Sequence, residues 1–300
     1  MTLPLELADR LRAAGLDPEW VEWFVTAALD EDLAGGVDVT SESTVPAGQR
    51  TTGDVVARRD GVVAGLPVAE AVFAVTTGGE YERKTSSVDG DAVRAGDVLM
   101  SISGSTRALL VAERTALNVA GRLSGIATLT RAWVDAVAGT GAVIRDTRKT
   151  TPLLRPLEKY AVRCGGGQNH RMSLSDAALI KDNHVVAAGG VAAAYRAVAD
   201  RFPDVPVEVE VDDVAGAVEA AEAGASLVLL DNFAVAEVTE AVRAVAEAAV
   251  RGRTRLEVSG GLTLDTVRPY AEAGVDYLAV GALTHSAPAL DIAFDLGEVA

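Results

Sequence analysis

The sequence predicts an α/β protein: a small sheet near the amino terminus, followed by a larger unit of parallel strands covered by helices. Short β-favouring runs punctuated by turns occupy residues 51–103, and alanine-rich helical segments alternate with short apolar strands after Glu113. Such alternation, with strands apolar almost throughout, indicates a parallel sheet covered by helices, most economically a (β/α) barrel. Six strands are clear in the sequence, fewer than the eight of a closed barrel.

The composition indicates a globular protein with a sizeable core. The chain has 300 residues, of which 49% are hydrophobic, enough for one large α/β unit or two domains. Its net charge of -16 argues against nucleic acid or an anionic membrane as partner, because either requires a broad positive face.

The start of the chain and its cysteine content predict a cytoplasmic protein. Glu6, Asp9, Arg10 and Arg12 interrupt the first residues, which excludes a secretory signal or a membrane span there. Cys164 is the only cysteine, so no intramolecular disulfide can form. We expect Cys164 to be a small buried or loop thiol rather than a nucleophile.

The elements of the first half begin with a helix over residues 18–33. Apolar residues at helical spacing place Trp20, Phe24 and Ala27 or Ala28 on one side, and core packing is the expected role of both tryptophans, Trp20 and Trp23. In the small sheet that follows, Gly-Asp pairs at 90–91 and 96–97 mark turns between strands.

In the second half, helices and strands alternate. The expected helices cover residues 113–138, 191–201, 214–223, 235–249 and 264–273. The expected strands lie in VIRDT, ALIKDN, VEVEVD, LVLLDN, LEVSGG and YLAVGA.

Polar residues or glycines follow each of these strands. In strand order they are Thr147 to Lys149, Lys181 to His184, Glu210 and Asp212, Asp231-Asn232, Ser259 to Gly261, and Gly281-Ala282. Because the carboxyl ends of parallel strands form the mouth of a barrel, we expect the chemistry there. Glycine turns after the last two strands are also where barrels commonly bind phosphate, on backbone N–H groups at a helix start.

The segment from residue 145 to residue 184 concentrates positive charge in an acidic chain. It has eight cationic and four acidic residues, a local charge of +4. Its cations are Arg145, Arg148, Lys149, Arg155, Lys159, Arg163, Arg171 and Lys181. Such a local excess, together with glycines and two histidines, indicates a pocket for a small, multiply charged anion.

Seven motifs then resemble the quinolinate phosphoribosyltransferase family. They are TRKTTPLLRPLEKYAV, GGGxNHRM, LIKDNH, EVEV, LLDNF, SGG and VGALTHS, and they run in order toward Ser286 after a matching ERTALNxxGRLSGIAT helix that begins at Glu113. The resemblance implies an amino-terminal α+β open sandwich domain followed by an incomplete parallel α/β barrel. The expected domains are residues 1–116, joined by residues 286–300, and residues 117–285.

The resemblance also implies an activity. The family converts quinolinate and phosphoribosyl pyrophosphate into nicotinate mononucleotide, pyrophosphate and CO2, with Mg²⁺, on the de novo route to NAD. Its members are homodimers in which one amino-terminal domain covers the partner's barrel.

The resemblance implies site residues wherever a position of this sequence matches a position of the family's motifs. Arg148, His170, Arg171 and Lys181 match positions that hold quinolinate, with Thr147 beside them, and Lys149 matches a position near both substrates. Arg114 matches an arginine that reaches the partner's site. Glu210 and Asp231 match contacts to the ribose and to Mg²⁺. The positions implied for the 5′-phosphate are Ser259, Gly260, Gly261, Gly281 and His285. The resemblance thus makes Lys149, Lys181, Glu210 and Asp231 the candidate catalytic residues.

Some assignments stay open. Glu208 is the main rival of Glu210, because strand alternation places both on one face, and Asp212 is a weaker rival. Arg155, Lys159 and Arg163 lie between motif positions, and solvated helix or loop faces are expected for them at least as much as pocket contacts. His184 is assigned either to the site or to a structural hydrogen bond within its loop.

Three other functions compete. A barrel aldolase would use Lys149 or Lys181 as a Schiff base. A related pyrophosphorylase-like protein of the molybdate-transport type shares the fold and many motifs. An inactive homologue would serve as a ligand sensor or scaffold, but every charged motif position is filled.

Overall fold

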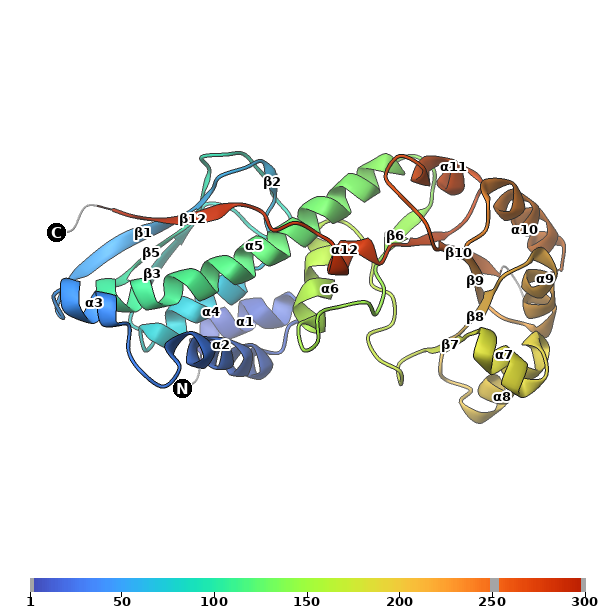
Figure 1. Ribbon diagram of the computed structural model, residues 1–300, viewed down its shortest axis with the longest axis horizontal. Helices are drawn as coiled ribbons and strands as arrows, with labels where there is room; N and C mark the ends of the chain where they lie inside the picture. The colour runs from blue at the N-terminus through green and yellow to red at the C-terminus, as the bar shows by residue number, and fades with distance from the viewer. Residues whose placement is uncertain (1–2, 249–253, 298–300) are drawn as a thin grey trace. The chain divides into compact units, whose positions relative to one another are not determined.

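The computed structural model describes residues 3–248 and 254–297, which fold into two compact units (Figure 1). The sandwich unit comprises Met1–Leu129, Thr151–Gly166 and Ser286–Ala300, and the barrel unit comprises Thr130–Thr150 and Gly167–His285. The units divide at residues 129/130, whereas the sequence predicted 116/117. No linker marks either position, because the single helix α5 (Thr106–Ala136) continues through both.

The sandwich unit is built on an antiparallel four-stranded sheet of order β12-β1-β5-β3. Its strands are β1 (Arg50–Ala57), β3 (Glu82–Thr85), β5 (Val98–Ser105) and β12 (Ile292–Leu296), and β2 (Gly61–Val62) pairs with β4 (Ala92–Val93). Its helices, besides the first part of α5, are α1 (Leu5–Ala13), α2 (Pro18–Leu33), α3 (Val39–Thr44), α4 (Leu66–Thr76) and α6 (Arg155–Cys164). The carboxyl-terminal residues enter this unit through β12, which pairs with β1.

Helix α2 has the predicted bounds but buries a different stripe. Asp17 caps its first turn by accepting a hydrogen bond from the Glu19 N–H group. The buried residues are Val21, Val25 and Leu29, spaced four apart, so the expected core role of the tryptophans was wrong for Trp23, which is 52% exposed. Two adjacent stripes of α2 are apolar, and the aliphatic one is the one that enters the core.

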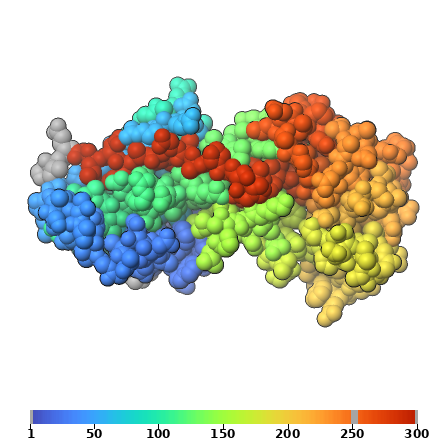
Figure 2. Space-filling view, in the orientation of Figure 1, coloured from blue at the N-terminus to red at the C-terminus, as the bar shows by residue number. Residues whose placement is uncertain are grey.

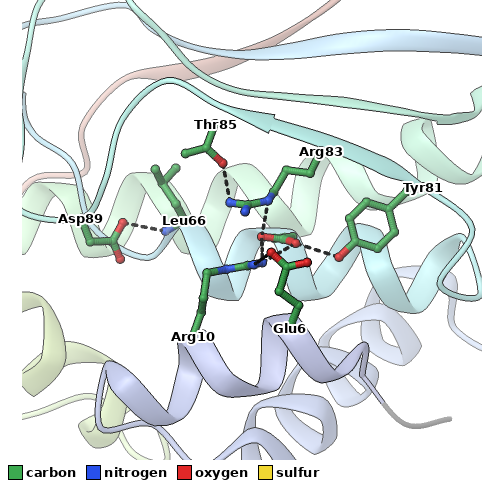
Figure 3. Close-up of polar contacts among 8 residues, drawn as sticks. Glu6, Arg10, Leu66, Tyr81, Arg83, Thr85 and Asp89 are labelled. Carbon is green, nitrogen blue, oxygen red and sulfur yellow. Dashed lines mark hydrogen bonds and ion pairs between the residues drawn. The ribbon is translucent and has the colours of Figure 1, made fainter.

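A buried carboxylate joins α1, α4 and the chain entering β3 (Figure 3). Glu70 accepts hydrogen bonds from Arg10 Nη2 at 2.6 and 2.7 Å and from the Tyr81 hydroxyl at 2.7 Å, and Arg83 Nε lies 3.3 Å away. Burial and this carboxylate raise the pKa of Tyr81 far above its usual range. The charge of Glu70 is therefore paired within the core, which makes its burial tolerable.

Two glycines let the carboxyl-terminal segment lie directly against α5. A Cβ on Gly125 would lie 2.0 Å from the Pro288 carbonyl oxygen, and one on Gly121 would lie 3.0 Å from that of Leu290. The Leu290 N–H group donates to the Gly121 carbonyl at 2.9 Å. Figure 2 shows this red segment along the green helix. The glycines of the predicted family helix therefore serve close packing.

The barrel unit contains all six predicted strands in one parallel sheet of order β6-β11-β10-β9-β8-β7. They are β6 (Val143–Arg145), β7 (Ala178–Ile180), β8 (Val207–Val211), β9 (Leu227–Asp231), β10 (Arg255–Ser259) and β11 (Tyr277–Ala279). β6 and β7 are the edge strands of the described sheet, which has six strands where a closed barrel has eight.

Helices line the outer side of this sheet (Figure 1). They are α7 (Asp182–Ala188), α8 (Val191–Arg201), α9 (Val214–Ala223), α10 (Val235–Ala248) and α11 (Val267–Glu272), whereas the short α12 (Ala282–His285) follows β11 beside the loop after β6. α8 and α9 have the predicted bounds, and α11 begins three residues later than predicted. Ala249, the predicted end of α10, lies outside the described residues. Among the described residues, no helix combines the length and apolarity needed to cross a membrane.

Candidate active site

A cavity of about 700 Å³ opens at the carboxyl ends of the barrel strands. Every element of its wall belongs to the barrel unit. Eleven predicted site residues line it: Thr147, Arg148, Lys149, His170, Arg171, Lys181, Glu210, Asp231, Ser259, Gly260 and Gly261. The structure thus brings most of the predicted residues together from six separate segments of the chain.

The loop after β6 is held by a hydrogen bond within it and by another from α12. The Thr147 hydroxyl accepts a bond from the Lys149 N–H group at 3.1 Å, and the Thr284 hydroxyl donates to the Lys149 carbonyl at 2.8 Å. A Cβ on Gly281 would lie 3.1 Å from Lys149 Cδ and 3.2 Å from His285 Nε2. Gly281 and His285 thus stand just outside the lining, next to Lys149, and a larger side chain at position 281 would displace the lysine.

Two arginines give this wall an excess of positive charge. Burial, followed by the nearby charge of Arg148, lowers the pKa of Arg171 below its usual range. Arg171 Nη1 donates to the Ala177 carbonyl at 2.9 Å, whereas Arg148 Nε is buried without a hydrogen-bond partner in the described part of the chain. A bound anion would relieve the repulsion and supply that missing acceptor.

His170 is fixed by hydrogen bonds at both ring nitrogens. Nδ1 accepts the N–H group of Arg171 at 2.8 Å, so Nδ1 carries no proton and Nε2 does. Nε2 lies 2.8 Å from Glu208 Oε2 and 3.4 Å from Glu257 Oε1. The ring of His170 is therefore held in a set orientation, with Nε2 toward the two buried carboxylates.

The two carboxylates behind His170 are buried. Glu208 is 3% exposed and Glu257 is 0% exposed, and Arg145 Nη1 donates to Glu257 at 2.5 Å while its guanidinium lies over the Tyr277 ring. Burial, followed by the negative charge of Glu208, raises the pKa of Glu257 to about 7. Glu257 also lines the cavity. Glu257 was not among the predicted site residues, although strand alternation from Ser259 places it on the same face.

Glu210 and Asp231 stand at the ends of neighbouring strands. Glu210 pairs with Lys181, and both carboxylates line the cavity. Glu208 shares a face of β8 with Glu210 but is bonded to His170, and Asp212 lines only an adjoining cavity of about 540 Å³, which Glu210 and Asp231 also border. The geometry favours Glu210 as the carboxylate that faces a ligand in the larger cavity.

The turn after β10 exposes its backbone toward the cavity. Gly260 and Gly261 adopt φ values of 95° and 63°, in the left-handed region that glycine accepts without strain. Asn232 lies against Gly260 and has a φ of 58°. It was not among the predicted site residues. A positive φ is rare for residues other than glycine, although asparagine tolerates it better than most.

The remaining candidate cations lie in the sandwich unit. Arg114 lines a cavity of about 290 Å³ with Phe24 and Asn118. Arg155, Lys159 and Arg163 belong to α6, which Tyr160 holds to this unit by donating to Asp89 at 2.6 Å. The solvated position expected for Lys159 was wrong, because its side chain is fully buried along with those of all its neighbours from Leu157 to Val162.

Two smaller predictions are confirmed. Cys164 is half-buried at the end of α6, and burial raises the pKa of its thiol to about 12, which disfavours the reactive thiolate. His184 Nδ1 accepts the Lys181 N–H group at 2.9 Å and so closes the first turn of α7, as the structural assignment predicted.

Comparison with known proteins agrees with this geometry. Residues 38–124 match the model for "Quinolinate phosphoribosyl transferase, N-terminal domain", and residues 126–295 match that for the C-terminal domain. The "Nicotinate-nucleotide pyrophosphorylase [carboxylating]" of Mycobacterium leprae is 51% identical over 274 residues, 91% of this chain and 95% of that protein. A "Quinolinate phosphoribosyltransferase [decarboxylating] 1" of Nicotiana glauca is 39% identical over 91% of this chain and 81% of its own length.

Solved structures give the same result. NadC from Streptococcus pyogenes superposes with a TM-score of 0.88 at 38% identity, over 95% of this chain and 98% of that one. The nicotinate-nucleotide pyrophosphorylase from Francisella tularensis gives a TM-score of 0.86 at 34% identity, over 93% and 96%. The open six-stranded sheet, the cavity at its carboxyl edge and these matches establish that the chain belongs to the quinolinate phosphoribosyltransferase family.

Proposed function

We propose that this protein transfers the phosphoribosyl group of phosphoribosyl pyrophosphate to quinolinate. Decarboxylation gives nicotinate mononucleotide, with pyrophosphate and CO2 as the other products, in de novo NAD biosynthesis. The observation that carries the proposal is a single cavity in which four cations, three carboxylates and a glycine turn meet. Relatives named for this reaction align over most of the chain.

Quinolinate fits the cationic wall. Its two adjacent carboxylates require several donors at fixed positions, which Arg148, Arg171 and Lys181 supply, with Thr147 at the edge. Each charge-assisted hydrogen bond contributes about 1.5–3 kcal/mol. Nicotinate lacks one carboxylate and would leave desolvated cations unpaired, so the same residues select quinolinate over nicotinate.

Phosphoribosyl pyrophosphate fits the glycine turn and the carboxylates of the same cavity. The backbone of Ser259 to Gly261 receives the 5′-phosphate, with Gly281 and His285 beside Lys149. Glu210 and Asp231 contact the ribose hydroxyls. When pyrophosphate leaves, positive charge develops on the ribose ring, and these fixed carboxylates lower the energy of that charge.

Mg²⁺ is proposed as the cofactor, and the donor set suits it. Glu210 and Asp231 offer carboxylate oxygens from adjacent strands to the same cavity, the ligand type that this hard cation prefers. When bound, largely through the substrate, Mg²⁺ would supply positive charge that offsets the negative charge of the leaving pyrophosphate.

The protein's own contribution is orientation and electrostatics. The arginines and Lys149 hold the pyridine nitrogen in line with the ribose carbon from which pyrophosphate departs. Once the nitrogen is alkylated, the bond from ring C2 to its carboxylate breaks and CO2 leaves; the electron pair that stays on C2 is stabilised by the adjacent pyridinium nitrogen and then takes a proton from water. No covalent intermediate with a lysine is needed.

Turnover tests this proposal directly. Folded protein supplied with quinolinate, phosphoribosyl pyrophosphate and Mg²⁺ should release CO2 and nicotinate mononucleotide in equal amounts. A Schiff-base aldolase would instead be trapped by borohydride with a carbonyl substrate. Quinolinate binding without CO2 release would indicate an inactive sensor and reject the proposal.

A homodimer with shared sites completes the proposal. Arg114 lines a cavity of the sandwich unit, and the family resemblance carries it into the partner's quinolinate site. Inactive Arg114→Ala and inactive Lys149→Ala proteins, co-folded as mixed dimers, should regain partial activity. If confirmed mixed dimers stay inactive, the shared site is rejected. A cytoplasmic location is proposed with it, consistent with a chain that has one cysteine.

A further inference from the structure

The residue after Asp231 has an unusual backbone. Asn232 adopts a φ of 58°, and its N–H group donates to the Ser259 carbonyl at 2.9 Å. Ser259 pairs with Asp231 where β9 and β10 end. The chain therefore turns sharply at Asn232 while staying bonded to the turn that follows β10.

The side chain of Asn232 makes a second link. Its Nδ2 atom donates to Asp231 Oδ2 at 2.8 Å. A carboxylate only accepts hydrogen bonds, so the amide nitrogen must face Asp231 and Oδ1 must face away. On that other side lies Gly260, where an added Cβ would come within 2.1 Å of Oδ1. One side chain thus touches both a predicted ribose carboxylate and a predicted phosphate turn.

We propose that Asn232 is a positioning residue that holds Asp231 and the Ser259–Gly261 turn in one arrangement for phosphoribosyl pyrophosphate. The inference rests on the proposed function and assigns this residue to one of its two substrates. Asn232 lines the same cavity, but it acts through Asp231 and Gly260 rather than on the reacting atoms.

Asn232→Gly tests the role of the amide, because glycine keeps the positive φ and removes only the side chain. We expect the Kd of phosphoribosyl pyrophosphate with Mg²⁺, measured by calorimetry, to rise roughly tenfold, the effect of one charge-assisted hydrogen bond. The apparent KM for quinolinate should change less than about twofold, since its cations lie on other segments. Ala34→Gly is the matched control, because Ala34 has a φ of 49° on the sandwich unit. It should leave both values unchanged.

A double-mutant cycle distinguishes positioning of Asp231 by Asn232 from a general loss of order in the cavity. In an Asp231→Asn background, Asn232→Gly should weaken binding of phosphoribosyl pyrophosphate by much less than tenfold, because the two residues act as a unit. The inference is overturned if Asn232→Gly binds both substrates like the wild type, if both affinities fall together, or if the tenfold loss is undiminished in the Asp231→Asn background. Failure of the wild type to release CO2 would instead reject the proposed function.

Discussion

His170 Nε2 lies 2.8 Å from Glu208 Oε2, while Nδ1 of the same ring accepts the backbone N–H group of Arg171. The ring therefore connects a buried carboxylate of β8 to the backbone of a residue that lines the substrate cavity. Because both nitrogens are used, the orientation of the ring is determined by its neighbours and not by the ligand.

Glu208→Ala should weaken quinolinate binding about tenfold, because the ring loses its closest acceptor and Arg171 loses a fixed neighbour. Simple electrostatics predicts tighter quinolinate binding instead, since this substitution removes a negative charge beside a site for a dianion. Calorimetric titration of Glu208→Ala with quinolinate distinguishes weaker binding from tighter binding. Asp212→Ala is the control and should bind nearly as the wild type, because Asp212 lines the adjoining acidic cavity and not the substrate cavity. Tighter binding by Glu208→Ala would refute the positioning role.

Glu257 should make stability depend on pH. Burial raises its pKa from an ordinary value of 4.5 to about 7, so the folded protein binds this proton more tightly than the unfolded chain. The contribution of this proton binding to the free energy of unfolding is thus fully present below about pH 4.5 and is lost as pH rises toward 7. Relative to Glu257→Gln, which is neutral throughout, the wild type should lose stability between pH 5 and pH 8.

Urea denaturation at several pH values measures this difference. Glu240→Gln, at an exposed position of α10, is the control and should follow the wild-type curve. A constant gap between wild type and Glu257→Gln across the range would contradict the raised pKa.

Gly260→Ala and Gly261→Ala should differ strongly although the residues are adjacent. A Cβ at position 260 would collide with Asn232, whereas one at position 261 meets nothing within 4 Å. Both positions have positive φ, so both variants share the cost of a left-handed alanine, about 1–2 kcal/mol. Only Gly260→Ala should raise the Kd for phosphoribosyl pyrophosphate by roughly tenfold or more. Equal effects would mean that backbone strain, and not the contact with Asn232, governs the turn.

Periodicity and order along the chain predicted most of the barrel unit. Each strand is a short apolar run that ends in polar residues or glycine, so its end could be located in the sequence, and parallel pairing then brings those ends to one edge. This is why residues as distant as Thr147 and Gly261 were expected in one site and line one cavity. The roles within the site came from the family resemblance, because spacing does not distinguish a cation that binds substrate from one that pairs with a neighbour.

What the sequence did not predict depends on tertiary packing. Lys159 is buried because every residue of α6 from Leu157 to Val162 is buried, polar ones included, and Trp23 is exposed because a parallel stripe of valines and leucine fills the core. Glu257 and Asn232 were not selected because their importance lies in contacts with residues on other strands or loops. Such contacts have no periodic signature in the chain.

Gly125→Ala should destabilise the sandwich unit. In an exposed helix this substitution stabilises by up to about 1 kcal/mol, because alanine has the higher helix propensity. Here the new methyl group would lie 2.0 Å from the Pro288 carbonyl oxygen, so α5 or the segment leading to β12 must shift, at a cost of about 1–3 kcal/mol. Gly121→Ala, whose Cβ would be 3.0 Å from the Leu290 carbonyl oxygen, should cost less. Urea midpoints should therefore fall in the order wild type, Gly121→Ala, Gly125→Ala, and a Gly125→Ala protein as stable as the wild type would show that the segment does not lie against α5.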